Sequence, residues 1–479
     1  MRVVIAGGGL AGLRTAEELR ARDFGGPITM IAAESRPPYD RPPLSKQALS
    51  ERTSPEPSSP APPSSGELLS GDVLRGEVLA REPDAAEIRA ELDTTLRADF
   101  TELAVDLRLG EPATAVELAG PYGSPGPGPG PGVSGGPGAD AASGGPGADA
   151  APRGPGADAA PRGPGAPGGL VRTARGAYPF DCLVVATGAE PVALPGPGRQ
   201  RFLRTHEDAL ELRARLRPGV RLVIVGAGWI GAELATAAAA RGCHVTVVEA
   251  GPAPLAGAVG AEVGAQTVPW YAAARVELRT SQAVESVEDG GLALASGGWI
   301  PADEIVTAVG VRPAVAWLAG SGVRLENGVA TDEHLRTSVP GVCAVGDCAS
   351  FLSLRYGRRL RFEHWDVALQ APRVAAANVL GADEVYDPVP YSWSEQFGRM
   401  MQYAGYHGSA DRLVWRGPGP SSPGPWTACW LSGPRLVALL AVDRPRDLAQ
   451  GRRVIASGTP VDVGLLTDPA VPLKNASVN

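Results

Sequence analysis

Two glycine-rich hexapeptides in this chain have the spacing that lets a backbone turn closely around a pyrophosphate. GGGLAG at residues 7–12 and GAGWIG at residues 226–231 both fit the pattern G-x-G-x-x-G. The first glycine permits a tight turn, the second lets the backbone approach the phosphates, and the third lets a helix pack closely on a strand. These glycines are Gly7, Gly9 and Gly12 in the first copy and Gly226, Gly228 and Gly231 in the second. One such copy alone could be a structural turn.

An acidic residue follows each glycine motif at the end of the next apolar run. Glu34 follows the first motif and Glu249 the second. A carboxylate at this position accepts hydrogen bonds from ribose hydroxyls, so each motif predicts a dinucleotide site. Glu249 would also repel a 2′-phosphate, and no arginine follows it closely. The second site is therefore expected to prefer NADH to NADPH.

The motifs need a strand before them and a helix after them, and the sequence supplies both twice. RVVIAG predicts a strand, GLAGLRTAEELRARD an amphipathic helix and ITMIAAE a second strand. RLVIVGAG, WIGAELATAAAARG and HVTVVEA repeat this order. From about residue 386 the chain has strand-like runs such as WTACWL and LVALLAV and no phosphate loop. The predicted fold class is α/β, with two Rossmann-like dinucleotide-binding domains and a C-terminal α+β domain.

Glycine and proline are concentrated between about residues 121 and 169, where GPGADAA-like units recur. Without large apolar residues such a segment cannot form a core, so we predict a disordered insertion. It interrupts an expected β-hairpin that runs from Leu107 to Leu118 and resumes at Leu170. A Ser/Pro-rich stretch at residues 52–66 is a second expected insertion or mobile loop.

The bulk properties exclude several classes of protein. The 479 residues carry a formal net charge of -8, which argues against a general nucleic-acid or anionic-membrane surface. No apolar run is long enough for a membrane span, and the N-terminus has no secretory cleavage signal. Five cysteines, an odd number, suggest reduced thiols and a cytoplasmic location. The histidines form no metal-like cluster, so no metal site is expected.

PPYDRPPLSK at residues 37–46 resembles the signature of FAD-dependent NAD(P)H:ferredoxin reductases of the putidaredoxin reductase type, which have a glutathione reductase-like fold. Further similar segments follow in order: LVVATGAEP (183–191), FLRTHEDA (202–209), GVCAVGDCA (341–349), RFEHWDVALQ (361–370) and VPYSWSEQFG (389–398). The resemblance implies an FAD-binding domain at 1–198 and 308–385, an NAD-binding domain at 199–307 and a C-terminal reductase domain at 386–479.

The resemblance also implies roles for individual residues. Lys46 would lie near the reactive edge of the flavin, and Glu233 would meet both Lys46 and the nicotinamide, so these two are the candidate catalytic residues. A buried Lys–Glu pair is costly unless each partner satisfies the other, which favours a functional position. The implied FAD contacts are Gly7, Gly9, Leu10, Ala11, Gly12, Glu34, Arg41, Lys46, Ala113, Thr187, Gly188, Arg204, Asp347 and Trp365. The implied NADH contacts are Gly226, Gly228, Ile230, Gly231, Glu233, Glu249 and Gly310.

The resemblance implies an enzyme that transfers electrons from NADH through FAD to a two-iron two-sulfur ferredoxin, or to a rubredoxin, serving an oxygenase. One alternative is an NADH oxidase or peroxidase, although no cysteine follows the first helix at the usual peroxidatic position. Another is a redox-sensing flavoprotein similar to apoptosis-inducing factor. The basic run with Arg355, Arg358, Arg359 and Arg361 is either a solvated loop or a docking patch for an acidic iron–sulfur protein.

Two cysteines have a spacing that could indicate redox chemistry. Cys343 and Cys348 are separated as in redox-active disulfides, but they bracket Asp347 and do not follow the first βαβ unit. We therefore expect them to be small packing residues.

Overall fold

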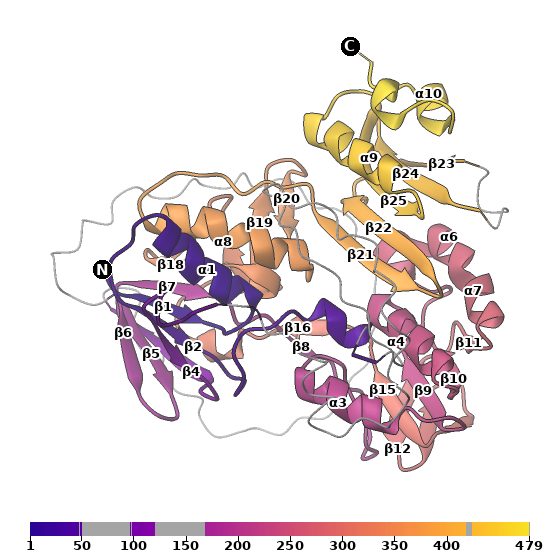
Figure 1. The fold of residues 1–479 in the computed structure, drawn as a ribbon, viewed down its shortest axis with the longest axis horizontal. Helices are drawn as coiled ribbons and strands as arrows, with labels where there is room; N and C mark the ends of the chain where they lie inside the picture. The colour runs from indigo at the N-terminus through magenta and orange to yellow at the C-terminus, as the bar shows by residue number, and fades with distance from the viewer. Residues whose placement is uncertain (47, 50–95, 97, 120–167, 418–423, 479) are drawn as a thin grey trace, which may run out of the picture.

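The computed structural model describes residues 1–46, 48–49, 96, 98–119, 168–417 and 424–478 (Figure 1). The predicted stretch at 52–66 lies outside these residues. The predicted insertion at 121–169 also lies outside them, except for Gly168 and Gly169.

A five-stranded sheet carries the first glycine motif. Its strands run parallel in the order β18-β7-β1-β2-β3. They are β1 (Val3–Ala6), β2 (Ile28–Ile31), β3 (Val105–Arg108), β7 (Cys182–Val185) and β18 (Val342–Ala344). Every residue of β1 is buried, because a parallel sheet is covered on both faces.

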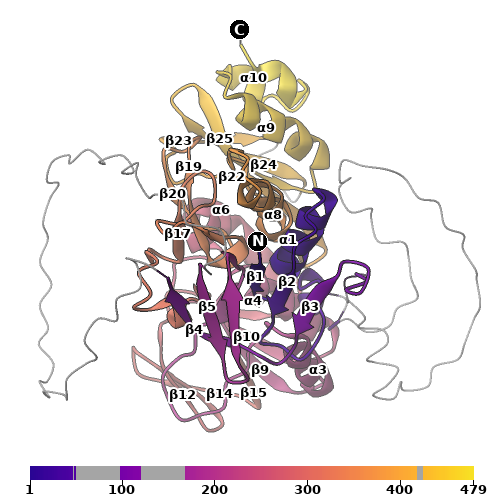
Figure 2. The same cartoon turned by 90° about the vertical axis from the view of Figure 1, so that its left-hand side faces the viewer.

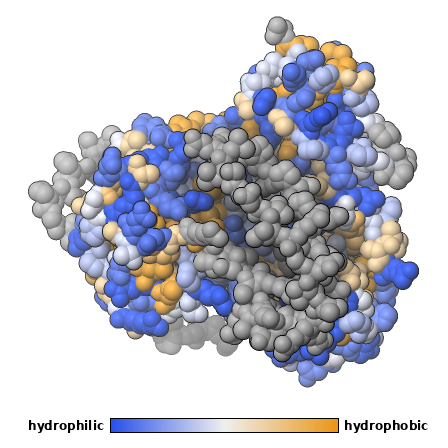
Figure 3. Space-filling model, in the orientation of Figure 1, coloured by the Kyte–Doolittle hydropathy of each residue, from blue (hydrophilic) through white to orange (hydrophobic). Residues whose placement is uncertain are grey.

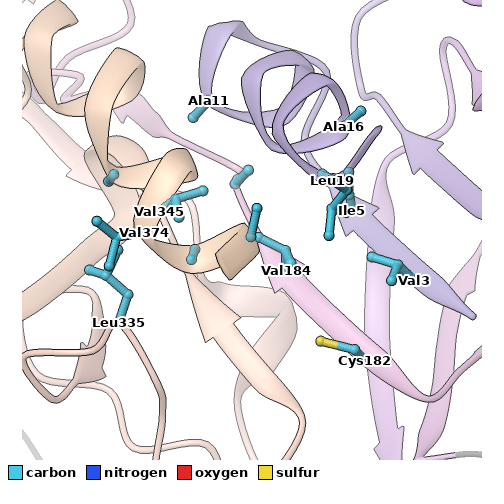
Figure 4. Packing of buried hydrophobic residues seen from close by; sticks show 14 of the residues in the cluster. Val3, Ile5, Ala11, Ala16, Leu19, Cys182, Val184, Leu335, Val345 and Val374 are labelled. Carbon is cyan, nitrogen blue, oxygen red and sulfur yellow. The ribbon is translucent and has the colours of Figure 1, made fainter. Parts of the chain in front are cut away.

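Alternate residues of these strands meet different partners, because successive side chains of a strand point to opposite faces. Val3 and Ile5 pack toward α1 (Leu10–Ala21) and α8 (Trp365–Val379), which lie side by side (Figures 1 and 4). Val4 and Ala6 instead face the antiparallel sheet β4-β5-β6, which lies on the other side of β1 from α1 (Figure 2). That sheet contains β4 (Ala113–Leu118), β5 (Gly169–Thr173) and β6 (Ala177–Phe180).

The predicted hairpin is present but begins later than expected. Leu107 belongs to β3 in the parallel sheet, whereas the hairpin partner of β5 starts at Ala113. Gly110 has a φ of +63° and Pro112 follows two residues later, so the chain turns between the two strands. The predicted run from Leu107 to Leu118 therefore divides between two sheets.

A four-stranded parallel sheet in the order β11-β10-β9-β15 carries the second glycine motif. Its strands are β9 (Arg221–Val225), β10 (His244–Val248), β11 (Glu277–Arg279) and β15 (Glu304–Thr307). The helices of this part of the chain are α3 (His206–Arg215), α4 (Trp229–Ala240), α5 (Ala256–Val259), α6 (Ala261–Gly264) and α7 (Val268–Ala273). An antiparallel sheet of β12 (Val284–Glu288), β13 (Gly291–Leu294) and β14 (Trp299–Pro301) adds Val287, Leu292 and Ile300 to the core.

Short strands connect the two parallel-sheet units. β8 (Ala189–Pro191) pairs with β16 (Val311–Pro313). The chain then forms the small sheet of β17 (Val329–Thr331), β19 (Ala349–Ser353) and β20 (Arg358–Leu360) before it enters α8. Single 3-10 turns complete the path, at η1 (Pro42–Ser45), η2 (Ala265–Thr267), η3 (Ala316–Leu318), η4 (Gly346–Cys348) and η5 (Leu473–Ala476).

The C-terminal part is an antiparallel sheet in the order β21-β22-β25-β24-β23, followed by two helices. Its strands are β21 (Tyr391–Gln396), β22 (Arg399–Gly405), β23 (Arg412–Arg416), β24 (Trp426–Ser432) and β25 (Arg435–Val442), and its helices are α9 (Pro445–Ser457) and α10 (Val463–Thr467). β21 contacts both α4 and α8, so this sheet touches both parallel-sheet units. The predicted α/β class with a C-terminal α+β domain is confirmed. The domain boundaries drawn from the sequence remain a proposal.

Both hydrophilic and hydrophobic residues reach the described surface on the face in Figure 3. Among the described residues, no helix has the length and apolarity needed to cross a membrane.

Candidate active site

One large cavity joins the two glycine motifs. Its volume is about 1410 Å³, above the roughly 300–1,000 Å³ usual for a pocket with one small ligand. Every sequence-predicted site residue except Gly12 and Gly231 lines it. These residues are Gly7, Gly9, Leu10, Ala11, Glu34, Arg41, Lys46, Ala113, Thr187, Gly188, Arg204, Asp347, Trp365, Gly226, Gly228, Ile230, Glu233, Glu249 and Gly310.

The first glycine loop needs glycine for a steric reason. Gly7 has a φ of +133°, and a Cβ there would lie 2.0 Å from the Ala186 carbonyl oxygen. A Cβ on Gly12 would lie 2.0 Å from the Gly7 carbonyl oxygen, so Gly12 allows α1 to pack against the loop and does not line the cavity. A Cβ on Gly231 would lie equally close to the Gly226 carbonyl oxygen, so the second loop repeats this geometry.

Both helices that follow the loops begin at a glycine without a side-chain cap. Gly9 precedes α1 and Gly228 precedes α4, and both line the cavity. The first N–H groups of a helix have no partner inside the helix, and the helix dipole is positive at this end. Each loop can therefore hold a phosphate on backbone donors.

Glu34 lies in a polar group that the sequence analysis described only in part. Its Oε1 accepts a hydrogen bond from Arg41 Nη2 at 2.5 Å, and its Oε2 accepts one from the Tyr39 hydroxyl. Burial raises the pKa of Tyr39, which keeps its hydroxyl protonated as a donor. Tyr39 was not predicted as a site residue, although it lies within the quoted segment PPYDRPPLSK.

Arg204 and Asp347 form an ion pair across the cavity wall, with 2.9 Å between Nη2 and Oδ2. The Asp347 backbone carbonyl accepts a hydrogen bond from Arg361 Nη1 at 3.2 Å. Trp365 donates from Nε1 to Asp40 Oδ1 at 2.9 Å and packs edge-on against Trp393, with ring centroids 5.7 Å apart. These contacts fix the walls near the start of α8.

The two candidate catalytic residues meet. Lys46 Nζ lies 2.9 Å from Glu233 Oε2, and their side chains are 19% and 3% exposed. Lys46 follows the η1 turn and Glu233 lies in the second turn of α4, so the pair links the two parallel-sheet units. Ser45 and Ser394 also donate hydrogen bonds to the Glu233 carboxylate. Both serines lie in quoted segments, but their type alone gave no signal of this contact.

Glu249 directly follows β10 and binds the backbone of the second loop region. Its Oε2 accepts a hydrogen bond from Ala227 N at 2.7 Å, and its Oε1 accepts one from Gly251 N at 2.7 Å. The carboxylate is therefore held at the cavity wall beside the second glycine loop.

The four arginines proposed as a docking patch do not share one environment. Arg355 donates to the Ile455 and Ala456 carbonyls, and Arg359 donates to the Thr331 and Ser350 carbonyls. Arg361 pairs with Glu363 and lines the cavity. Of these four, Arg358 alone is exposed, and its guanidinium lies over the Tyr406 ring at 5.4 Å from the centroid.

The five cysteines are buried free thiols. Cys348 Sγ donates to the carbonyls of Val185 and Val345, and burial raises its pKa. Cys343 packs in β18 as part of the parallel sheet. Among the described residues, no group of three or more His, Cys, Asp or Glu side chains could hold a metal ion.

Comparisons with known proteins place this site in a family. Residues 1–117 and 169–371 match the family described as pyridine nucleotide-disulphide oxidoreductase, and residues 391–477 match the reductase C-terminal domain. The chain belongs to the pyridine nucleotide-disulphide oxidoreductase family. The break between the two matched ranges falls where the sequence predicts the Gly/Pro-rich insertion.

Individual relatives and solved structures are similar to this chain over nearly its whole length. The chain is 33% identical over 481 aligned positions to the ferredoxin–NAD(+) reductase component of the anthranilate 1,2-dioxygenase system from Burkholderia cepacia, covering 98% of each chain. It is similar to the crystal structure of Fdr9, with 41% identity and a TM-score of 0.78 over 98% of this chain and 99% of that one. It is also similar to putidaredoxin reductase in its covalent complex with putidaredoxin, with 27% identity and a TM-score of 0.76 over 99% and 97% of the two chains. The family resemblance inferred from the sequence is confirmed.

The cavity wall has polar atoms that fit a bound dinucleotide. Within the described residues, four buried atoms on this wall lack a hydrogen-bond partner: Arg204 Nε, Gln282 Oε1, Trp317 Nε1 and His364 Nδ1. Because these four atoms are enclosed, the groups that fit a dinucleotide are the backbone donors at the two glycine loops, which line the cavity.

His364 should make the stability of the protein depend on pH. Part of its ring faces the cavity, but Nδ1 is enclosed, and burial lowers its pKa from 6.5 to about 4. The folded protein therefore favours the neutral ring, and this contribution is present above pH 6.5 and is lost as the pH falls toward 4. We expect the loss to reach about 3 kcal/mol of unfolding free energy.

Urea unfolding of the wild type and of His364→Asn over this pH range measures the effect. The variant should lose less stability on acidification than the wild type. His244→Asn is the control, because His244 is exposed and its replacement should leave the pH dependence unchanged. An equal pH dependence in all three proteins would contradict the prediction.

Proposed function

We propose that this chain is an NADH-dependent, FAD-containing reductase that passes electrons to a small iron–sulfur protein, a two-iron two-sulfur ferredoxin, which serves an oxygenase. The observation that carries the proposal is the single cavity in which both glycine loops and the Lys46–Glu233 pair meet. The names of the relatives support the acceptor, since these proteins are ferredoxin reductase components of dioxygenase systems. The buried free thiols are consistent with a cytoplasmic location.

The residues of the first loop fit the FAD and those of the second fit the NADH. Gly9 and the N-terminus of α1 would hold the FAD pyrophosphate, with Glu34 near its ribose and the Arg204–Asp347 pair near the chain that leads to the ring. Gly228 and Glu249 would hold the NADH in the same manner. When bound, the flavin accepts a hydride from the nicotinamide and releases electrons one at a time, while the protein orients the two rings.

Lys46 would act through its charge. Its ammonium group would lie beside the bound FAD ring and would stabilise the negative charge that hydride transfer develops there. Glu233 keeps Lys46 in place, because a partly buried ammonium needs a nearby counter-ion. Neither residue has to form a covalent bond with the substrate.

Stopped-flow absorbance tests the function directly. The purified protein is mixed with NADH and then with a two-iron two-sulfur ferredoxin. Flavin bleaching followed by rapid ferredoxin reduction supports the proposal. Slow bleaching to a persistent long-wavelength band, with no ferredoxin reduced, would contradict it and favour an oxidase or a redox sensor.

Glu249 should set the preference for NADH. Glu249→Gln removes the negative charge that would repel a 2′-phosphate, so the ratio of kcat/KM for NADH to that for NADPH should fall by about tenfold. Steady-state kinetics with each nucleotide and an artificial dye as acceptor measures this ratio. Glu277→Gln is the control, because it changes the same charge on the neighbouring strand at an exposed position outside the cavity wall. An unchanged ratio in Glu249→Gln would show that the carboxylate does not select the nucleotide.

We propose that Arg358 attracts an acidic iron–sulfur protein. It is exposed and lies three residues before Arg361, which lines the cavity. Charge reversal at Arg359 would be harder to interpret, because Arg359 donates to two backbone carbonyls. Arg358 is therefore the clearer probe of the basic run that includes Arg355, Arg359 and Arg361.

Arg358→Glu should slow ferredoxin reduction by about tenfold at low salt and leave NADH-to-dye activity intact, because charge complementarity mainly accelerates encounter. The difference should shrink as ionic strength rises. Arg412→Glu reverses the same charge at an exposed position of β23 and serves as the control. An equal loss of ferredoxin reduction in both variants would argue against a docking role for Arg358.

A further inference from the structure

The carboxylate of Glu233 is held by residues from two other parts of the chain. Lys46 Nζ and the Ser45 hydroxyl donate to Oε2 from the segment at η1. The Ser394 hydroxyl donates to Oε1 at 2.6 Å from β21 of the C-terminal sheet. Glu233 itself belongs to α4, so the carboxylate lies where α4, η1 and β21 meet.

The Ser394 hydroxyl is oriented to donate its hydrogen to the Glu233 carboxylate. Its side chain is buried, and its Oγ accepts a hydrogen bond from Gln396 Nε2 at 3.0 Å. A serine hydroxyl has a single hydrogen to donate. Because Gln396 occupies an acceptor position of Oγ, the hydrogen is directed to Glu233 Oε1.

The two carboxylate oxygens therefore accept hydrogen bonds from different segments of the chain. Ser394 holds Oε1, which leaves Oε2 facing the Lys46 ammonium. Without the Ser394 bond, the carboxylate could rotate about its terminal torsion, which is broad in Glu. Oε2 would still be held by Ser45 and Lys46, but Oε1 would have lost its bond to Ser394, so the distance from Oε2 to Lys46 Nζ would be less narrowly fixed.

We propose that Ser394 is a positioning residue that fixes the Glu233 carboxylate against Lys46, so that the C-terminal domain completes the hydride-transfer site. This inference rests on the proposed function, in which Lys46 and Glu233 act beside the flavin and the nicotinamide. It assigns the C-terminal sheet a part in hydride transfer from NADH to FAD, in addition to any part in partner binding.

A simpler role for Ser394 would be to join β21 to α4, and Thr236 provides a matched control for it. Thr236 Oγ1 accepts a hydrogen bond from Phe397 N at 3.0 Å, which links α4 to the residue that follows β21. Its hydroxyl donates to the Ala232 carbonyl and not to the Glu233 carboxylate. Thr236→Val therefore breaks a hydrogen bond between the same two segments and leaves the carboxylate untouched.

The first measurement is flavin bleaching by NADH in a stopped-flow instrument. Ser394→Ala should slow the bleaching by about tenfold, as expected when one hydrogen bond to a charged group is lost. Thr236→Val should remain close to the wild type. Ser394→Cys is a second variant that fills the same space but donates only weakly, and it should also be slow.

The second measurement needs no turnover. Lys46 and Lys474 are the two lysines of the chain, so trace acetylation with acetic anhydride, quantified by mass spectrometry of the peptides, reports on each separately. The Lys46 amine must leave its hydrogen bond to the Glu233 carboxylate before it can attack the anhydride, so a fixed carboxylate slows the reaction. In the FAD-loaded protein without NADH, Lys46 should react several times faster in Ser394→Ala than in the wild type. Lys474 is exposed and should react equally in all variants.

Four outcomes separate this inference from the proposed function. Slow bleaching and faster Lys46 acetylation in the Ser394 variants, with Thr236→Val unchanged, support the positioning role. Equal behaviour of Ser394→Ala and Thr236→Val in both measurements would overturn it. If the wild type is bleached by NADH but reduces no ferredoxin, the proposed acceptor is wrong and the positioning role is still decided by these variants. If NADH does not bleach the wild type, the proposed function and this inference both fail.

Discussion

The structure depends on how one buried carboxylate is satisfied. Glu233 is 3% exposed, and an ionised group removed from water costs several kcal/mol unless partners replace the lost hydration. Those partners are Lys46, Ser45 and Ser394, and no single segment of the chain could supply all three. The need to satisfy Glu233 therefore favours one relative placement of the two parallel-sheet units and the C-terminal sheet. The cavity between the glycine loops follows from this placement.

Steric constraints at the two glycine loops also shape the cavity, in addition to the polar contacts of Glu233. Gly7 and Gly12 leave no room for a Cβ, and the second loop repeats the arrangement. Each loop thereby brings a helix N-terminus to the wall of the same cavity. Two equivalent phosphate sites that face one cavity suit the meeting of two dinucleotides, and the Lys46–Glu233 pair lies on the wall that both share.

The family name refers to disulphide chemistry, whereas the features of this chain point to a different acceptor. Cys343 and Cys348 are buried thiols, and Cys348 donates to backbone carbonyls within the core. In our proposal the electrons leave the protein through an encounter with a separate carrier, not through an internal dithiol. The surface that meets this carrier should then affect the rate of ferredoxin reduction more than the rate of hydride transfer. The reason is that charge complementarity mainly affects association. The Arg358→Glu variant tests whether ferredoxin reduction can be slowed without a change in flavin reduction by NADH.

The local features of this protein could be predicted from its amino-acid sequence. The glycine spacing, the acidic residues after the strands and the continuous apolar run of β1 depend on residues close in the chain, so pattern and steric reasoning could find them. Contacts between distant segments could not be found in this way. Examples are the pairing of Ala113 with Thr173, the inward bonds of Arg355 and Arg359, and the Ser394–Glu233 bond, which depend on geometry that no local pattern encodes. Serine, tyrosine and arginine occur on many surfaces, and only the tertiary structure decides which of them is enclosed beside a charge.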